Sequence, residues 1–450
     1  MKIKVAGAGA GKTTKMAARI LDLDIPPGKI VYCVAFTNAA TANIKAKIAE
    51  ENGVVPANVK VSTIHSFLYS EFVHPYYHLL YGTRYLRIST IALAGKPAFR
   101  NKQIGELEQQ RLLHQTVIPQ RAKWVVDGKA ADSAKAKALR GQVMALFAGY
   151  CHRIIVDEAQ DINKEILDVV LALDQAGIDI ELSGDPKQDV KGHGCFRQLI
   201  DMFPEAVEYS SECHRCPQTH LQISNRLACE SERQVADEGA REGSLDVLFE
   251  ADIDARALIE GGGYGLAYIS RRNDRFNTHA NDEPDKRLDT LRHHLASAIM
   301  NKQGVSSTDL EVKRAAYYLG KKMLAFVDGG GEVGRAINWG IEAGYFDFDK
   351  KAYAKMAKAL EAGESSSSEG IAVRSIEAVK GLEHDKCLFV LTGDLAPYLM
   401  GDKVEDNKTM HLLYVALTRS LDNLAIVVTP EVESKFSREQ ILAAFGKRST

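Results

Sequence analysis

A glycine-rich segment near the start of the chain combines small residues with a lysine and two threonines. It reads Ala6-Gly7-Ala8-Gly9-Ala10-Gly11-Lys12-Thr13-Thr14 and follows the short apolar run Ile3–Val5. Small residues let successive backbone N–H groups curl around a phosphate at the positive end of the following helix. In such a loop the Lys12 ammonium reaches the β- and γ-phosphates, and the Thr13 hydroxyl is a ligand of Mg²⁺. The alternative, a glycine-rich turn formed by chance, is disfavoured because strand and helix patterns flank the segment.

Nucleotide hydrolysis needs a second element, one with acidic residues, besides the glycine-rich loop. The segment Ile154-Ile155-Val156-Asp157-Glu158-Ala159-Gln160-Asp161 supplies it. An apolar strand that ends in two carboxylates would put Asp157 on the magnesium shell and let Glu158 polarise the attacking water. Taken alone, a strand that ends in Asp-Glu is common. Together with the phosphate loop, it indicates ATP hydrolysis with Mg²⁺.

These residues require a parallel sheet to position them. Strand and helix patterns alternate at the start of the chain, again around residues 153–182, and again in the last eighty residues, which predicts crossover helices between parallel strands. The predicted strands are Ile3–Ala6, Ile30–Phe36, Arg153–Val156, Ile178–Leu182, Ile371–Val373, Cys387–Leu391 and Leu424–Val428, and the predicted helices are Lys12–Leu23, Ala39–Glu50 and Lys164–Leu173.

Two long blocks interrupt this pattern and predict insertions. The first, at 71–150, is helical in pattern and carries twelve Lys and Arg against five Asp and Glu, whereas the second, at 277–370, is nearly neutral and ends in a Ser-rich linker at 363–370. We therefore expect a first lobe from 1–70 and 151–204, and a second lobe from 205–276 and 371–450. Tyrosines, Trp124 and arginines are interleaved in the basic block, which suits either a DNA backbone contact or an ordinary helical subdomain.

The overall composition excludes a polybasic protein, because 57 Lys and Arg face 59 Asp and Glu. No apolar stretch approaches the roughly 20 residues that cross a bilayer, and the N-terminus turns to glycines too early for a signal peptide. The seven cysteines are scattered, and the Cys213–Cys216 pair, although spaced as zinc ligands are, is not followed by a second pair. We therefore expect a cytoplasmic protein with reduced thiols and no membrane partner.

At this point the motifs resemble those of superfamily 1 DNA helicases of the UvrD/Rep/PcrA type. Ala35-Phe36-Thr37-Asn38-Ala39-Ala40 and Ser62-Thr63-Ile64-His65-Ser66-Phe67 are similar to the family's segments that contact single-stranded DNA, and Val156–Asp161 to its metal and catalytic-base motif. Gly184-Asp185-Pro186-Lys187-Gln188 resembles the segment whose glutamine senses the γ-phosphate. The resemblance implies that Phe36, Thr37, Asn38, Thr63 and His65 bind DNA and that Gln188 is catalytic.

The second half of the chain resembles the family in the same order. Cys213-His214-Arg215 stands where the family has Asn-Tyr-Arg, Lys380-Gly381-Leu382-Glu383 is identical to its motif, and Leu413–Arg419 is close to its last motif. The resemblance implies that Arg215 and Arg419 are arginine fingers, that His214 stacks on adenine, and that Gly381 and Glu383 contact the nucleotide. Two such arginines neutralise charge at the γ-phosphate, so hydrolysis would wait for lobe closure.

Several positions depart from the family pattern. His193 occupies the place of a base-stacking tryptophan and is expected to touch DNA, Lys191 replaces an aromatic residue, and Glu377 replaces a histidine. Five residues precede Ala6, so the glutamine segment that reads adenine in the family is not found ahead of the loop.

Together these features predict an α/β fold of two RecA-like parallel-sheet lobes, each with a mainly helical insertion. The predicted activity is an ATP-dependent single-stranded DNA translocase or helicase, with 3′→5′ direction implied by the resemblance. One alternative is a DNA-sensing ATPase that regulates a partner nuclease without unwinding, as compact relatives do in anti-phage systems such as Gabija. A structural subunit with a decayed motor is a third possibility, which the intact catalytic motifs disfavour.

Overall fold

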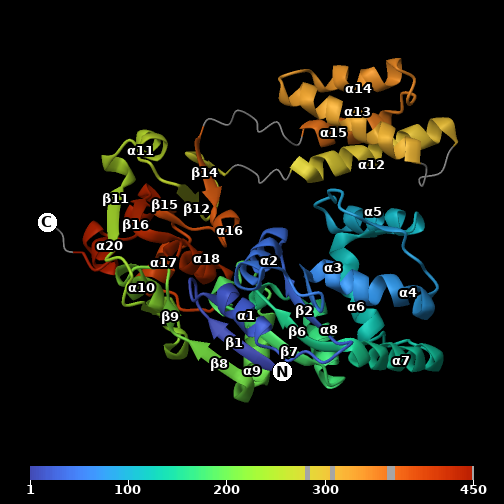
Figure 1. Cartoon of the computed structure of the whole chain (residues 1–450). Helices are drawn as coiled ribbons and strands as arrows, with labels where there is room; N and C mark the ends of the chain where they lie inside the picture. The colour runs from blue at the N-terminus through green and yellow to red at the C-terminus, as the bar shows by residue number, and fades with distance from the viewer. Residues whose placement is uncertain (279–283, 305–309, 362–369, 448–450) are drawn as a thin grey trace. The chain divides into compact units, whose positions relative to one another are not determined.

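The computed structural model describes residues 1–278, 284–304, 310–361 and 370–447. Within them the chain divides into two compact units (Figure 1). The first unit contains Met1–Thr83, Ile118–Thr278 and Gly370–Thr450, and the second contains Arg84–Val117 and His279–Glu369. The expected Ser-rich linker at 363–370 lies, apart from Gly370, outside the described residues.

The phosphate loop belongs to the first sheet of unit one, whose six described strands are all parallel, in the order β3-β2-β6-β7-β1-β8. These strands are β1 (Lys2–Ala6), β2 (Ile30–Ala35), β3 (Val59–Thr63), β6 (Cys151–Val156), β7 (Asp179–Gly184) and β8 (Val207–Ser210). Helices α1 (Lys12–Leu21), α2 (Asn38–Asn52), α8 (Lys164–Gln175) and α9 (Cys195–Met202) connect them. The strands are apolar because helices cover a parallel sheet on both faces, and Met16, Val31, Ile44 and Ile155 are buried together in one core.

A second parallel sheet forms the other half of unit one, with its described strands in the order β11-β16-β15-β12-β14-β13. They are β11 (Ser244–Phe249), β12 (Leu266–Ile269), β13 (Phe276–Thr278), β14 (Ile371–Ser375), β15 (His384–Leu391) and β16 (Ser420–Val428). Its helices are α10 (Gln218–Ser224), α11 (Ala255–Gly261), α16 (Ile376–Val379), α17 (Ala396–Met400), α18 (Lys408–Leu417), α19 (Pro430–Glu433) and α20 (Arg438–Ala444). The prediction of a two-lobed parallel α/β fold is confirmed.

The expected basic insertion at 71–150 is divided between the two units. Helices α4 (His74–Tyr81), α6 (Ile118–Val126) and α7 (Ala134–Tyr150) belong to unit one, together with α3 (Ile64–Leu68). The reason is aromatic packing, because the buried rings of Phe72 and Phe147 contact each other and the ring of Phe67, beneath β2. The first lobe also extends past the expected boundary at 204, since β8 pairs with β1 as far as Ser210.

Unit two consists of the rest of the first block, Arg84–Val117, and of nearly all of the second block. A short parallel pair, β4 (Arg87–Ser89) and β5 (Leu112–His114), accompanies helix α5 (Pro97–Gln109). Helices α12 (Pro284–Gln303), α13 (Leu310–Asp328), α14 (Val333–Glu342) and α15 (Lys350–Glu361) pack side by side, as the yellow and orange helices of Figure 1 show. Leu295, Met323, Ile337 and Leu360 lie in their shared core.

The two halves of unit one share a buried ionic network. The Lys187 ammonium lies 3.1 Å from an oxygen of Asp185 and 3.2 Å from an oxygen of Glu232, and the three side chains are at most 2% exposed. Arg197 also pairs with Glu232, and it lies 3.2 Å from Asp406. Burial would raise the pKa of the Glu232 carboxyl, but the Arg197 hydrogen bond and the Lys187 and Arg197 charges lower it overall. Each member therefore depends on the others to remain ionised.

We predict that Glu232→Gln lowers the free energy of unfolding at pH 7 by about 3 kcal/mol, because it leaves the buried Lys187 charge poorly compensated. Since the folded pKa of Glu232 is below its ordinary 4.5, its contribution is complete above that value and is lost as the pH falls through the folded pKa. Urea unfolding at pH 7 and pH 4 measures both effects. The exposed neighbour Glu230 provides the control Glu230→Gln. Equal stability of the two variants at pH 7 would contradict the prediction.

Candidate functional site

The phosphate loop lies between β1 and α1, as its pattern predicted. Gly9 and Gly11 adopt left-handed φ values of 72° and 67°, which residues with a side chain rarely adopt. The Lys12 ammonium donates to the carbonyl oxygens of Ala6 at 3.0 Å and Gly7 at 2.9 Å. Thr13 is half-buried, whereas Thr14 is exposed on the first turn of α1. The loop thus presents backbone N–H groups and one ammonium at a helix N-terminus.

The two carboxylates at the end of β6 lie beside this loop. The Thr13 hydroxyl donates to Asp157 Oδ2 at 3.2 Å, and burial, followed by the Glu158 charge, raises the pKa of Asp157 to about 6. Glu158 has a left-handed φ of 56°, a strained conformation that costs on the order of 1–3 kcal/mol outside glycine. Its carboxylate accepts a hydrogen bond from Gln160. Backbone strain and a perturbed carboxylate at one place are typical of functional sites.

The donor set here fits a magnesium ion. Thr13 and Asp157 offer a hydroxyl and a carboxylate oxygen, the hard ligands that Mg²⁺ prefers, with room for water and phosphate oxygens. The raised pKa of Asp157 shows that its charge lacks compensation from the protein alone. In the described residues no cluster of three or more His, Cys, Asp or Glu side chains could hold a metal by itself.

The second half of unit one closes directly over the phosphate loop. The backbone N–H of His214 donates to Gly9 O at 2.9 Å, and Cys213 Sγ donates to Ala8 O at 3.1 Å. A Cβ on Gly9 would lie 2.3 Å from the Cβ of Arg215. The His214 ring lies close to Gly11 and pairs with Asp237. The predicted adenine-stacking residue therefore lies at the rim of the loop.

Both predicted arginine fingers have partners of their own. Arg215 pairs with Glu383, another predicted site residue. Arg419 is fully buried, and its guanidinium donates to Val415 O at 2.9 Å, Leu382 O at 3.2 Å and the Thr418 hydroxyl at 3.0 Å. Burial, followed by the Arg215 charge, lowers the pKa of Arg419. Arg419 therefore also holds its own lobe together.

A cavity of about 840 Å³ opens between the two sheets and collects these groups. Its lining includes all six predicted catalytic residues, Lys12, Asp157, Glu158, Gln188, Arg215 and Arg419, and also Ala8, Gly9, Thr13, Phe36, Thr37 and Gly381. The other predicted nucleotide residues, Gly7, Ala10, Gly11, Thr14, His214 and Glu383, lie outside the lining, although most are loop neighbours of residues within it. Gln188 is held by its amide, which donates to Asp185 Oδ2 at 2.9 Å.

Two of the predicted DNA residues, Phe36 and His65, lie near Lys191. Its ammonium lies 5.7 Å from the Phe36 ring centre and 3.6 Å from Asp161, and its charge, after burial, lowers the pKa of His65. Thr37 and Thr63 accept hydrogen bonds as N-caps of α2 and α3, from Ala40 at 3.0 Å and Ser66 at 3.2 Å. Asn38 and His193 are exposed and do not line the cavity. The threonines thus have local structural roles besides any contact with DNA.

Three residues at the site were not selected from the sequence. Gln234 donates to Ala8 O at 3.0 Å, and its amide lies where a side chain on Gly7 would have to go. Tyr414 donates to Gln234 at 2.9 Å and accepts from Ala8 N at 3.4 Å. Lys380 bridges the halves, 2.9 Å from Asp161 Oδ1. Lys380 and Tyr414 stand inside quoted motifs, whereas no pattern marks Gln234.

The interleaved rings and cations of the basic block pack mainly on one another. Tyr77 is buried, Tyr81 donates to Trp124 O at 2.8 Å, and the Arg121 guanidinium lies 4.1 Å from the Trp124 ring centre. The Lys129 ammonium lies 3.7 Å from the same ring. These contacts support the interpretation of this part of the block as an ordinary helical subdomain.

We predict that Gly9→Ala destabilises the protein more than Gly28→Ala does. Both glycines have a left-handed φ, which costs a residue with a side chain roughly 1–2 kcal/mol, but only Gly9 faces an obstructing atom within 4 Å. Thermal unfolding of the two variants separates the steric effect from the conformational one. Equal losses of melting temperature would show that Arg215 does not press on the loop.

Comparison with known proteins finds similarity in the part of the chain that contains the phosphate loop and the carboxylates at the end of β6. Residues 1–193 match the family model of an AAA domain. Over 77 residues the chain is 39% identical to the putative ATP-dependent DNA helicase YjcD of Bacillus subtilis (strain 168), which covers 16% of this chain and 10% of that protein. Among the solved structures that are similar to this chain, one is the Arterivirus nonstructural protein 10 helicase in complex with DNA, with a TM-score of 0.36 and 9% identity over 99% of this chain and 63% of that chain. Another is the PRRSV helicase, with a TM-score of 0.35 and 10% identity over 95% of this chain and 52% of that chain. The chain thus spans about a tenth of the curated relative and less than two thirds of these structures. Residues 1–193 are therefore similar to an AAA domain.

Proposed function

We propose that the chain is an ATP-dependent motor of the UvrD-like type that moves along single-stranded DNA. The observation that carries this proposal is the cavity between two parallel-sheet lobes, which is lined by the phosphate-loop lysine and two carboxylates of the first lobe and by two arginines of the second. Such an arrangement couples the γ-phosphate to lobe closure, because the arginines complete the site only when the lobes meet. The likeness of residues 1–193 to AAA domains, and of a short stretch to a putative DNA helicase, supports the same activity.

In this mechanism each residue has a defined task. Lys12 exchanges the Ala6 and Gly7 carbonyls for phosphate oxygens. Thr13 and Asp157 would hold Mg²⁺, which would neutralise charge on the phosphates when it is bound. Glu158 orients the attacking water and takes its proton, while Arg215 leaves Glu383 to meet the charge that develops on the γ-phosphate.

The DNA strand would cross the cavity at Phe36. The ring offers a stacking face for a base, and Lys191 beside it offers a cation for the backbone. Lys380, which bridges the lobes through Asp161, links the DNA side of the cavity to the catalytic carboxylates. Breaking and re-forming this bridge during each ATP cycle would let one lobe release the strand while the other holds it.

We predict that Lys12→Ala and Glu158→Gln each lower kcat for ATP by at least about a hundredfold, because each removes a group that acts on the transferring phosphate or on the water. Single-strand-stimulated ATP turnover measures this. Lys102→Ala, which removes an exposed ammonium in unit two, is the control and should retain full activity. Normal turnover in either site variant would refute the assignment of this site.

We further predict that the wild type displaces a strand from a duplex with a 3′ single-stranded tail and fails on the 5′-tailed equivalent. A strand-displacement assay with both substrates, with the Glu158→Gln variant as the inactive control, measures this. DNA-stimulated hydrolysis without displacement would instead support the sensor function, in which the ATPase regulates a partner such as a nuclease.

A further inference from the structure

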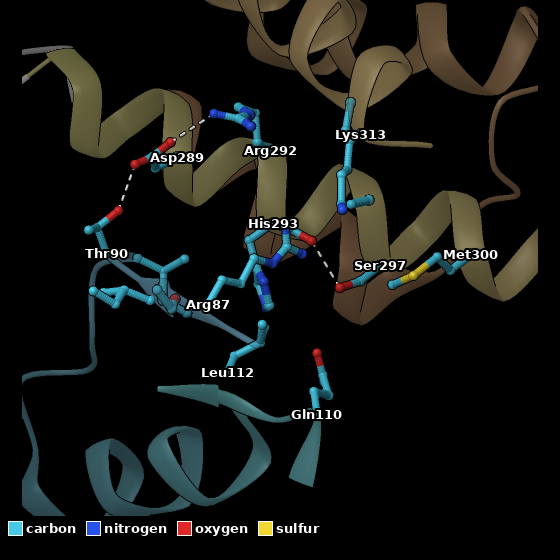
Figure 2. A pocket seen from close by; sticks show the side chains of 15 residues that line it. Arg87, Thr90, Gln110, Leu112, Asp289, Arg292, His293, Ser297, Met300 and Lys313 are labelled. Carbon is cyan, nitrogen blue, oxygen red and sulfur yellow. Dashed lines mark hydrogen bonds and ion pairs between the residues drawn. The ribbon is translucent and has the colours of Figure 1, made fainter. Parts of the chain in front are cut away.

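A second cavity, of about 250 Å³, lies within unit two and plays no part in the proposed ATP cycle (Figure 2). It is enclosed by the strand pair β4 and β5 and by helices α12 and α13. The lining residues are Arg87, Ile88, Ser89, Thr90, Ile91, Gln110, Leu112, Asp289, Arg292, His293, Ala296, Ser297, Met300, Lys313 and Ala316. Segments more than 170 residues apart in the sequence thus build one concave surface.

One face of α12 lines this cavity. Its lining positions recur at helical spacing, as Asp289, Arg292, His293, Ala296, Ser297 and Met300. The opposite face carries Leu291, Leu295 and Ile299, which are buried in the core of the helical bundle. The helix is therefore packed on one side and presents polar and cationic side chains on the other.

The lining has more positive than negative charge. Arg87 comes from β4, Arg292 from α12 and Lys313 from α13, and Figure 2 shows Arg87, His293 and Lys313 around the same space. Asp289 is the one carboxylate among the described lining residues, and both of its oxygens are engaged. It accepts from Thr90 Oγ1 at 2.6 Å and from Arg292 at 3.1 Å.

The two histidines of α12 are kept neutral mainly by burial. Burial, then the charges of Lys355 and Arg87, lowers the pKa of His293. Burial, then His293 and Lys355, lowers the pKa of His294 to about 3. Both rings are therefore neutral at pH 7, and neither adds a positive charge.

We propose that this cavity binds a phosphate monoester, the dianionic terminal phosphate of a nucleotide or of a nucleic-acid end. Cations converge on one space from three elements, which suits a terminal group enclosed on several sides better than a diester that continues past the site. Ser89 and Gln110 add a hydroxyl and an amide group able to donate to phosphate oxygens, whereas the Thr90 and Ser297 hydroxyls donate to Asp289 and to the His293 carbonyl. The volume is below the roughly 300–1,000 Å³ of pockets that enclose whole small molecules. The site thus holds the phosphate and adjoining sugar atoms and leaves the base outside.

The test uses the full chain carrying Lys12→Ala, so that the phosphate loop contributes little to binding. Isothermal titration calorimetry compares inorganic phosphate, AMP, and an oligothymidine with either a 5′-phosphate or a 5′-hydroxyl. Each titration is repeated after adding Arg87→Glu, which reverses a cation of the cavity on an exposed strand position. Arg314→Glu makes the same change one residue beyond Lys313 on α13, outside the cavity, and is the matched control. If Arg87→Glu does not fold, Arg87→Gln replaces it.

We expect phosphate, AMP and the 5′-phosphorylated oligonucleotide to bind, and Arg87→Glu to weaken each at least about tenfold, the effect of losing one charge-assisted hydrogen bond. Arg314→Glu should leave these affinities unchanged. Because the proposed DNA path at Phe36 can bind either oligonucleotide, the source is judged from the loss of affinity that Arg87→Glu causes. A larger loss for the phosphorylated oligonucleotide than for AMP would identify a nucleic-acid end as the source, and the reverse a free nucleotide. Affinities for phosphate and AMP that are indifferent to Arg87→Glu, or an equal loss on Arg87→Glu for the 5′-hydroxyl and the 5′-phosphorylated oligonucleotide, would overturn the proposal.

Discussion

The close approach of the phosphate loop to the second lobe is the constraint on which the rest of the site depends. Gly9 must lack a side chain because Arg215 occupies the space, and its carbonyl accepts from the His214 backbone. Cys213 and Gln234 both donate to the carbonyl of Ala8. Since these contacts involve the loop backbone itself, a change in the relative position of the lobes must change the loop's hydrogen bonds. This is a direct physical route from lobe closure to phosphate binding.

Incomplete charge compensation at Asp157 makes the same region sensitive to a bound cation. Asp157 is a buried carboxylate with a raised pKa, and Glu158 beside it is held in a strained backbone conformation. A cation at Asp157 would remove an electrostatic cost that the folded chain bears by itself. The neighbouring network around Lys187 is fully compensated and is expected to stay rigid. The site thus combines one carboxylate, Asp157, whose charge is not fully compensated with a neighbouring network around Lys187 whose charges are.

Charge in unit two is also incompletely compensated, at the cavity lined by α12. Its helical core is apolar, while the cavity beside the opposite face of α12 is lined, among the described residues, by three cations, Arg87, Arg292 and Lys313, and by one carboxylate, Asp289. A surplus of like charge in a concave surface is unfavourable unless an anion neutralises it. The near-zero charge of the whole chain conceals this, because net charge describes a sum and binding depends on local arrangement.

Local patterns in the sequence determined much of this protein. Glycine spacing specified the phosphate loop, apolar runs specified most strands, and paired motif residues specified all six catalytic candidates that line the cavity. Strands β3, β8, β11, β12 and β13 of the two sheets were not predicted, because their apolar runs are brief or interrupted. Only the tertiary structure divided the 71–150 block, since the aromatic contacts of Phe72 and Phe147 join segments distant in sequence. The same holds for Gln234 at the loop and for the cations of unit two, because proximity across folded segments leaves no periodic signal in the chain.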